Sequence, residues 1–254
     1  MDVLRRLELL KILILGLIIT TGCKFSGEKE EGLKDALKNK FYIGVAVNDN
    51  IVNGKDSLAV KIILKHFSSI VAENCMKMEP IHPAKDSFNF EQADAFVAFG
   101  EKYNLHIIGH CLVWHSQAPE WIFIDDKGKD VCKDTLINRM RNHIYTVVKR
   151  YKGKVKGWDV VNEAIEDNGE YRKSKWFTII GPEWIELAFR FAHEADSSAE
   201  LYYNDYNEWF PAKREAIYKL VKGLKEKGIR IDGIGMQAHL NMETPSYEEY
   251  EEAI

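Results

Sequence analysis

The feature that most constrains the fold is an alternation of two kinds of segment, which starts near Lys38. Short runs rich in β-branched and aromatic residues predict strands, and the longer segments between them carry apolar residues at helical spacing. Strands that alternate with helices indicate a parallel sheet covered by helices. The chain is therefore predicted to be an α/β protein, with strands over residues 42–47, 69–73, 106–114, 155–161, 200–204 and 231–238.

Some of the intervening helices carry signals for their ends. Asp134 is expected to cap a long helix, Pro182 to occupy the first turn of the next one, and Gly228 to end a later one. The residues expected to face the core are Ala93, Phe96, Val97, Tyr103, Ile137, Met140, Ile144, Val147, Val148, Tyr151, Ile185, Ala188, Phe189, Ala192, Ala216, Ile217, Leu220 and Leu224.

Two parallel architectures compete, an open doubly wound sheet and a closed (β/α)8 TIM barrel. A dinucleotide-binding open sheet should carry a glycine-rich turn after its first strand, but residues 48–50 read Asn-Asp-Asn. Polar residues follow most of the predicted strands, and a barrel brings such strand ends together on one face. The sequence therefore favours a barrel, of which about the first six β/α units are present. The polar strand ends lie at residues 73–74, 110–115, 162–163, 204–206 and 237–239.

The amino terminus resembles an export signal. Arg5 and Arg6 precede an apolar stretch that is too short to span a bilayer, and Thr-Thr-Gly leads into Cys23. We expect residues 1–22 to be a lipoprotein-type signal peptide, Cys23 to be lipidated, residues 23–37 to be a polar tether and residues 38–254 to be the barrel. The protein is then exported, as a cell-envelope lipoprotein that touches the membrane only through the lipid. Plain secretion with an incidental cysteine is the alternative.

Composition excludes some classes of function. The formal net charge of −4 gives no basic surface for nucleic acid. Cys75, Cys111 and Cys132 are an odd set without zinc spacing, so they are expected to be structural thiols. No cluster with metal-ligand spacing occurs, and neither a metal nor an organic cofactor is expected.

Glu163 is the carboxylate best placed for catalysis. It follows the predicted strand 155–161, and a carboxylate at the mouth of a barrel strand is suited to proton transfer. The alternative is a solvated loop glutamate beside Glu166 and Asp167.

Five motifs in this order resemble glycoside hydrolase family 10, the family of endo-1,4-β-xylanases. They cover the chain from about Lys38 to its last residue. The motifs are AENCMK at 72–77, GHCLVWHSQ at 109–117, WDVVNEA at 158–164, YNDYN at 203–207 and GIGMQAH at 233–239.

The resemblance implies retaining hydrolysis of internal β-1,4 bonds in xylan, with Glu163 as the general acid/base. It places Asn162 on the 2-hydroxyl of the cleaved sugar. It implies that Glu73, Asn74 and Lys77 grip the non-reducing side, although an ion pair between Glu73 and Lys77 is an alternative. The other residues expected to contact substrate or to position the site are His110, Trp114, Gln117, Asn204, Tyr206, Gln237 and His239. Trp114 and His239 could instead belong to the core.

The resemblance also implies a nucleophilic glutamate on a seventh strand, which is not found before Ile254. Glu243 belongs to the turn after the sixth strand and is not expected to replace it. Residues 248–252 are expected to be the solvated face of a helix. The chain is therefore expected to be a fragment of a longer xylanase. Its alternatives are an inactive truncated surface lipoprotein that binds xylan weakly, and hydrolysis of another β-1,4 glucan.

Overall fold

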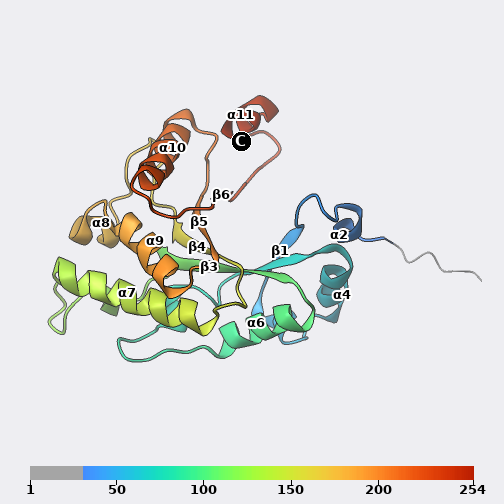
Figure 1. The fold of residues 1–254 in the computed structure, drawn as a ribbon, viewed down its shortest axis with the longest axis horizontal. Helices are drawn as coiled ribbons and strands as arrows, with labels where there is room; N and C mark the ends of the chain where they lie inside the picture. Colours follow the sequence, from blue (N-terminus) through green and yellow to red (C-terminus); the bar gives the residue numbers. More distant parts are fainter. Residues whose placement is uncertain (1–30) are drawn as a thin grey trace, which may run out of the picture.

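The computed structural model describes residues 31–254, which contain one parallel sheet of six strands in the order β1-β2-β3-β4-β5-β6 (Figure 1). The strands are β1 Gly44–Val47, β2 Ser69–Ala72, β3 His106–Trp114, β4 Gly157–Asn162, β5 Glu200–Asp205 and β6 Gly233–Met236. A doubly wound sheet reverses its strand order at one point, and these strands show no reversal. The sheet is part of a (β/α)8 barrel, which confirms the predicted fold class.

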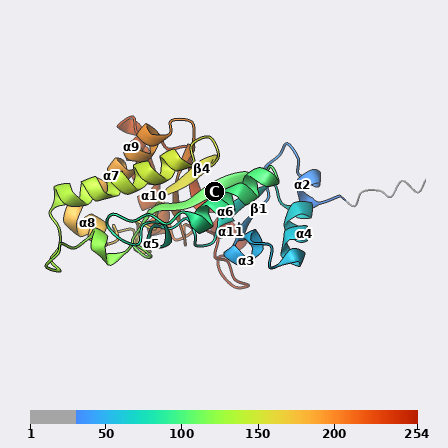
Figure 2. The same cartoon turned by 90° about the horizontal axis from the view of Figure 1, so that it is seen from below.

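Helices connect the strands and cover the outside of the sheet. The bounds are α2 Leu33–Ala36, α3 Asp49–Val52, α4 Ser57–His66, α5 Met78–Ile81, α6 Glu91–Lys102, η1 Glu120–Ile122, α7 Lys133–Arg150, α8 Lys175–Ile180, α9 Trp184–Ala195, α10 Pro211–Glu226 and α11 Tyr247–Ala253. Helix α7 packs against α9 and β3, and α9 also packs against β4 and β5 (Figure 2). Parallel strands are joined by such crossovers, so the carboxyl ends of all six strands lie at the same end of the sheet.

The strand that precedes the catalytic candidate Glu163, β4, lies entirely in the core. All six residues of β4 are buried, as expected for a strand covered on both faces. Trp158 fills the space beside β3, where a Cβ atom on Gly109 would lie 2.2 Å from the Trp158 ring. Close packing here fixes the register of β4 against β3, and with it the place where β4 ends.

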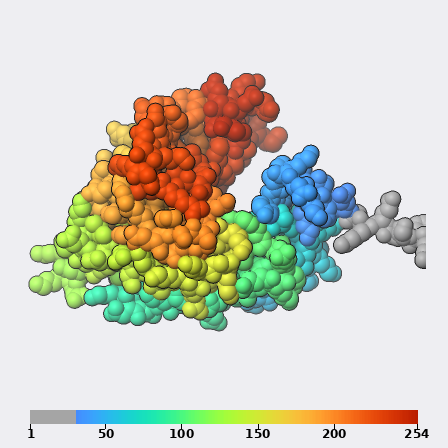
Figure 3. Space-filling model, viewed as in Figure 1, coloured from blue at the N-terminus to red at the C-terminus, as the bar shows by residue number. Residues whose placement is uncertain are grey.

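The sheet has two edges in the described residues, because neither β1 nor β6 has a partner on its outer side. The space-filling view shows a hollow between the red residues near the C-terminus and the blue residues of α2 and β1 (Figure 3). The described residues thus form an open half-barrel.

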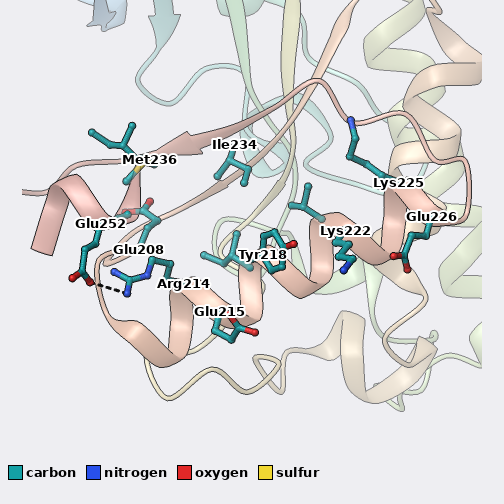
Figure 4. A pocket seen from close by; sticks show the side chains of 14 residues that line it. Glu208, Arg214, Glu215, Tyr218, Lys222, Lys225, Glu226, Ile234, Met236 and Glu252 are labelled. Atoms are coloured by element: carbon teal, nitrogen blue, oxygen red, sulfur yellow. Dashed lines mark hydrogen bonds and ion pairs between the residues drawn. The ribbon is translucent and has the colours of Figure 1, made fainter.

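A groove of about 1090 Å³ lies between α10, β6 and α11 (Figure 4). Ile217, Tyr218 and Val221 line it from α10, and Ile234 and Met236 line it from β6. None of the residues expected to carry the chemistry lines this groove, so its size does not mark the active site.

Two of the predicted helix starts are wrong by a few residues. Asp134 lies in the first turn of α7, and Cys132 occupies the N-cap position. Pro182 precedes Glu183, the N-cap of α9, so it lies outside that helix. Both starts differ from the prediction by two residues, a shift within the usual variation of helix ends. The predicted end at Gly228 is confirmed, because this residue follows the C-cap Lys227 with a φ of +73°.

The predicted tether, residues 23–37, lies largely outside the described residues. Its last part forms α2, where Lys34 donates a hydrogen bond to the carbonyl of Leu64 at the end of α4. The signal peptide and Cys23 lie outside the described residues. Within residues 31–254, no helix has both the length and the apolar character needed to cross a membrane.

The three described cysteines are free thiols, as predicted. Cys75 and Cys111 are buried, and burial raises the pKa of Cys75 to about 12, so both behave as small core residues. Cys132 is exposed.

Candidate active site

Glu163 stands directly after β4, at the carboxyl end of the sheet, in an unusual backbone conformation. Its φ is +57°, in the left-handed region that residues other than glycine rarely adopt. Two hydrogen bonds hold this conformation. The Glu163 N–H donates to the carbonyl of Asn204 at 2.9 Å, and the Glu163 carbonyl accepts from Nε of Arg172 at 2.9 Å.

Both oxygens of the Glu163 carboxylate have N–H donors. Trp114 Nε1 donates to Oε2 at 2.8 Å. Asn162 Nδ2 and Gln237 Nε2 donate to Oε1 at 3.2 and 3.0 Å. The side chain is only 13% exposed, so Glu163 is not the solvated loop glutamate of the alternative prediction. Its orientation is set by groups from β3, β4 and the segment after β6.

The amide side chains around Glu163 form a connected set. The Asn162 Oδ1 atom accepts from Asn204 Nδ2 at 2.8 Å and from Gln237 Nε2 at 3.1 Å. His239 Nε2 lies 2.9 Å from Gln237 Oε1, and the His239 side chain is exposed rather than part of the core. Because each amide contacts the next, the ends of β4, β5 and β6 are held in one arrangement.

A second group of predicted residues lies at the ends of β2 and β3. Lys77 Nζ donates to Asn74 Oδ1 at 2.9 Å and lies 5.0 Å from the centroid of the Trp114 ring. Gln117 Nε2 donates to the same Asn74 oxygen at 3.4 Å. Glu73 is exposed and forms no ion pair with Lys77 among the described residues, and Lys77 bonds to Asn74 instead, so the alternative of a buried structural pair is wrong.

Trp114 is half-buried, at the carboxyl end of β3. Its ring contacts Lys77 on one side and donates to the Glu163 carboxylate on the other. The Trp114 carbonyl accepts a hydrogen bond from Trp176 Nε1 at 2.9 Å. His110 lies nearby, and its Nδ1 is 2.8 Å from Asp159 Oδ2 in the middle of β4. Asp159 thereby sets the orientation of the imidazole.

Tyr206 follows β5 and is held from two sides. Its hydroxyl oxygen accepts from Arg172 Nη2 at 2.9 Å, and Lys213 Nζ lies 3.7 Å from its ring centroid. Lys213 is completely buried and pairs with Asp205 at 2.9 Å and with Asp167 at 3.1 Å. Burial raises the pKa of Asp205, while hydrogen bonds from Tyr203 and Lys213 oppose that effect.

His115 is a titratable group close to the Glu163 carboxylate. Its Nδ1 lies 4.0 Å from Glu163 Oε2. Burial lowers the pKa of His115, and the positive charge of Arg172 lowers it further against the opposing effect of the carboxylates. The imidazole of His115 is therefore mostly uncharged near neutral pH.

The predicted site residues are thus brought together, and the structure adds partners that the sequence did not single out. Asp159, Arg172 and Lys213 have no periodic or motif signal of their own beyond the WDVVNEA run that contains Asp159. Among residues 31–254 no group of three or more His, Cys, Asp or Glu side chains could hold a metal ion. Glu243 is exposed in the turn after β6, and the glutamates of α11 are solvated as predicted.

Comparison with known proteins gives a consistent result. The family model described as glycosyl hydrolase family 10 matches residues 32–254. Endo-1,4-beta-xylanase A of Xylanibacter ruminicola is 54% identical over 227 residues, which are 89% of this chain and 62% of that protein. Endo-1,4-beta-xylanase of Geobacillus stearothermophilus is 48% identical over 225 residues, which are 87% of this chain and 66% of that protein. The chain thus spans just under two thirds of the length of these two relatives.

Solved structures agree with the sequence relatives. Xylanase XynB from Paenibacillus barcinonensis, complexed with a conduramine derivative, has a TM-score of 0.85 and 42% identity, covering 89% of this chain and 68% of that one. A mutant of the intracellular xylanase TsXylA from Thermoanaerobacterium saccharolyticum, in complex with xylotriose, has a TM-score of 0.84 and 41% identity, covering 89% and 72%.

Proposed function

Since the chain belongs to glycosyl hydrolase family 10, we propose that it acts as an endo-1,4-β-xylanase that cleaves internal bonds of xylan with retention of configuration. The observation that carries the proposal is the Glu163 carboxylate at the mouth of β4, with indole and amide donors on both oxygens. The substrate class comes from the relatives, whose names specify xylanases.

Glu163 is the general acid/base in this proposal. As the acid, it gives its proton to the oxygen of the leaving sugar while a second carboxylate attacks the anomeric carbon. As the base, it takes a proton from the water that hydrolyses the glycosyl-enzyme. The two carboxyl groups must stand about 5–5.5 Å apart for this chemistry, and we assign no nucleophile among residues 31–254.

The two groups of polar residues contact different parts of the substrate in this proposal. Lys77, Asn74 and Gln117 are linked at the ends of β2 and β3, and together with Glu73 they are suited to sugar hydroxyls on the non-reducing side. Tyr206, beyond Glu163, is suited to the leaving-group side. Asn162 is held by Asn204 and Gln237, which leaves it aligned for the 2-hydroxyl of the cleaved sugar.

The test is the hydrolysis of xylan by the complete protein in its wild-type form, by its Glu163→Ala variant and by the matched control Glu170→Ala, whose side chain is exposed in the same loop. We expect Glu163→Ala to lose about 10²–10⁴-fold in kcat/KM on xylan, because general acid catalysis contributes about that much. An aryl xylobioside with an activated leaving group needs no proton in the first step, so its cleavage step should be largely spared. Equal activity of Glu163→Ala and wild type on xylan would contradict the role of Glu163. A wild-type chain that binds xylotetraose without cleaving xylan would instead match the inactive xylan binder.

We also propose that the protein is exported and anchored by a lipid on Cys23. The support is the sequence alone: two arginines, an apolar stretch and Thr-Thr-Gly before the cysteine. A single lipidated end holds a soluble domain at a membrane surface.

A further inference from the structure

Arg172 lies in the loop after β4, nine positions beyond Glu163, yet the loop folds back so that the two residues meet. Ile165 and Tyr171 form an isolated antiparallel bridge, and the Arg172 N–H donates to the carbonyl of Ala164 at 2.8 Å. These contacts close the loop and turn the arginine side chain toward the site. Its side chain is only 17% exposed.

Each nitrogen of the Arg172 guanidinium has a separate partner. Nε donates to the Glu163 carbonyl at 2.9 Å, and Nη2 donates to the Tyr206 hydroxyl at 2.9 Å. Nη1 lies 3.1 Å from Glu166 Oε1. Because the guanidinium is planar and rigid, two bonds from one fork fix the distance and angle between the groups that accept them.

The bond to the Glu163 carbonyl matters because of the backbone conformation of Glu163. For a residue with a Cβ atom the left-handed region is unfavourable, so neighbouring groups must hold it. The Glu163 N–H is held by Asn204 and its carbonyl by Arg172. The peptide groups on both sides of the Cα atom are therefore fixed, and they set the direction of the Cα–Cβ bond from which the carboxylate extends.

The hydrogen bond from Arg172 to Tyr206 also fixes a residue on the proposed leaving-group side of the site. The ring of Tyr206 rests against Lys213, and its hydroxyl is held by Arg172. One guanidinium therefore contacts the main chain of the proposed acid/base and the side chain of the proposed leaving-group wall.

We propose that Arg172 is a positioning residue. It fixes the carboxylate of Glu163 relative to Tyr206, so that the proton donor lies close to the oxygen of the leaving sugar. The catalytic meaning of this role rests on the proposed function. The positioning itself is a property of the folded chain and can be measured without turnover.

The test uses the Trp114 indole as a reporter, because its N–H donates to Glu163 Oε2. The chain has six tryptophans, so the Trp114 indole cross-peak in a ¹⁵N–¹H spectrum is assigned with Trp114→Phe. Glu163→Ala gives the position of this cross-peak when the bond is lost. We expect the cross-peak in Arg172→Met to shift toward that position, and also in Arg172→Lys, which keeps the charge but loses the fork.

Two control variants separate positioning from simple anchoring of the loop. Glu166→Gln removes the ion pair of the loop but leaves the bonds from Arg172 to Glu163 and Tyr206, so the Trp114 cross-peak should stay in place. Arg190→Met removes an exposed arginine of α9 that pairs with Glu186, and it should also leave the cross-peak unchanged.

An unshifted Trp114 cross-peak in folded Arg172→Met overturns the proposal. So does a shift in Glu166→Gln as large as in Arg172→Met, because loop anchoring would then explain both. If Arg172→Met does not fold, Arg172→Lys decides: a shift supports the fixed fork, and an unshifted cross-peak overturns it. If the protein proved not to hydrolyse xylan, the proposed function would fail, but these spectra would still show whether Arg172 positions Glu163.

Discussion

His143 of α7 is a buried imidazole, and among residues 31–254 neither of its ring nitrogens has a partner in good hydrogen-bond geometry. It stacks on His82, with 5.5 Å between ring centroids and 8° between planes. Burial, and then the neighbouring His82, lowers the pKa of His143 from 6.5 to about 3. Burial lowers the pKa of His82 as well. Acid should therefore destabilise the fold through this pair.

The sign and size follow from linkage. As the pH falls below 6.5, the unfolded chain binds a proton at His143 while the folded chain does not until the pH approaches 3. Stability from this residue is therefore complete above pH 6.5 and is lost progressively below it. At pH 5 the loss is about 2 kcal/mol relative to pH 8, since RT ln(1 + 10^1.5) is about 2 kcal/mol.

The measurement is urea unfolding at pH 8 and pH 5, followed by tryptophan fluorescence, for wild type and for His143→Leu. The leucine cannot take up a proton, so the difference in unfolding free energy between the two pH values should shrink by about 2 kcal/mol. His193→Leu is the control, because the His193 side chain is exposed on α9 and remains in water when the chain unfolds. A pH difference in His143→Leu equal to that of wild type, within about 0.5 kcal/mol, would refute the reasoning.

Two further predictions concern the buried lysine and the amino terminus. Lys213→Met should cost about 3–5 kcal/mol in urea unfolding at pH 8, because Asp205 is left buried without its cation, and adding Asp205→Asn should recover most of that loss. A cost below about 1 kcal/mol would count against a buried ion pair. If Cys23 carries a lipid, Cys23→Ser should move the protein from the membrane fraction to the soluble exported fraction. Retention of this variant on membranes would exclude the lipid as the anchor.

The sequence predicted the strands well because each is a short apolar run bounded by polar residues. Strand β3 has the predicted bounds of 106–114, and the other five differ from prediction by one or two residues at either end. Helix starts were harder. Asp134 and Pro182 have the right chemistry for a helix start, but Cys132 and Glu183 take the cap positions, because several residues near a helix end can serve as the start and the ends vary by one or two residues.

Lys213 shows the limit of reasoning from pattern. On a helix with a polar face, a lysine is expected to be solvated. Here the side chain is completely buried, since Lys213 in the first turn of α10 lies against Asp205 at the end of β5 and against the ring of Tyr206. Nothing in the local sequence distinguishes this lysine from Lys219 or Lys222 on the same helix.

By itself, the sequence determined the order and type of the elements, the parallel sheet and the strand ends where polar residues gather, because the periodicity of apolar residues reflects burial directly. Only the tertiary structure decided which polar groups touch. Arg172 reaches Glu163 through a folded-back loop, and His82 meets His143 across 61 positions of sequence. Such pairings depend on where separate elements cross in space, and a one-dimensional pattern carries no signal for that crossing.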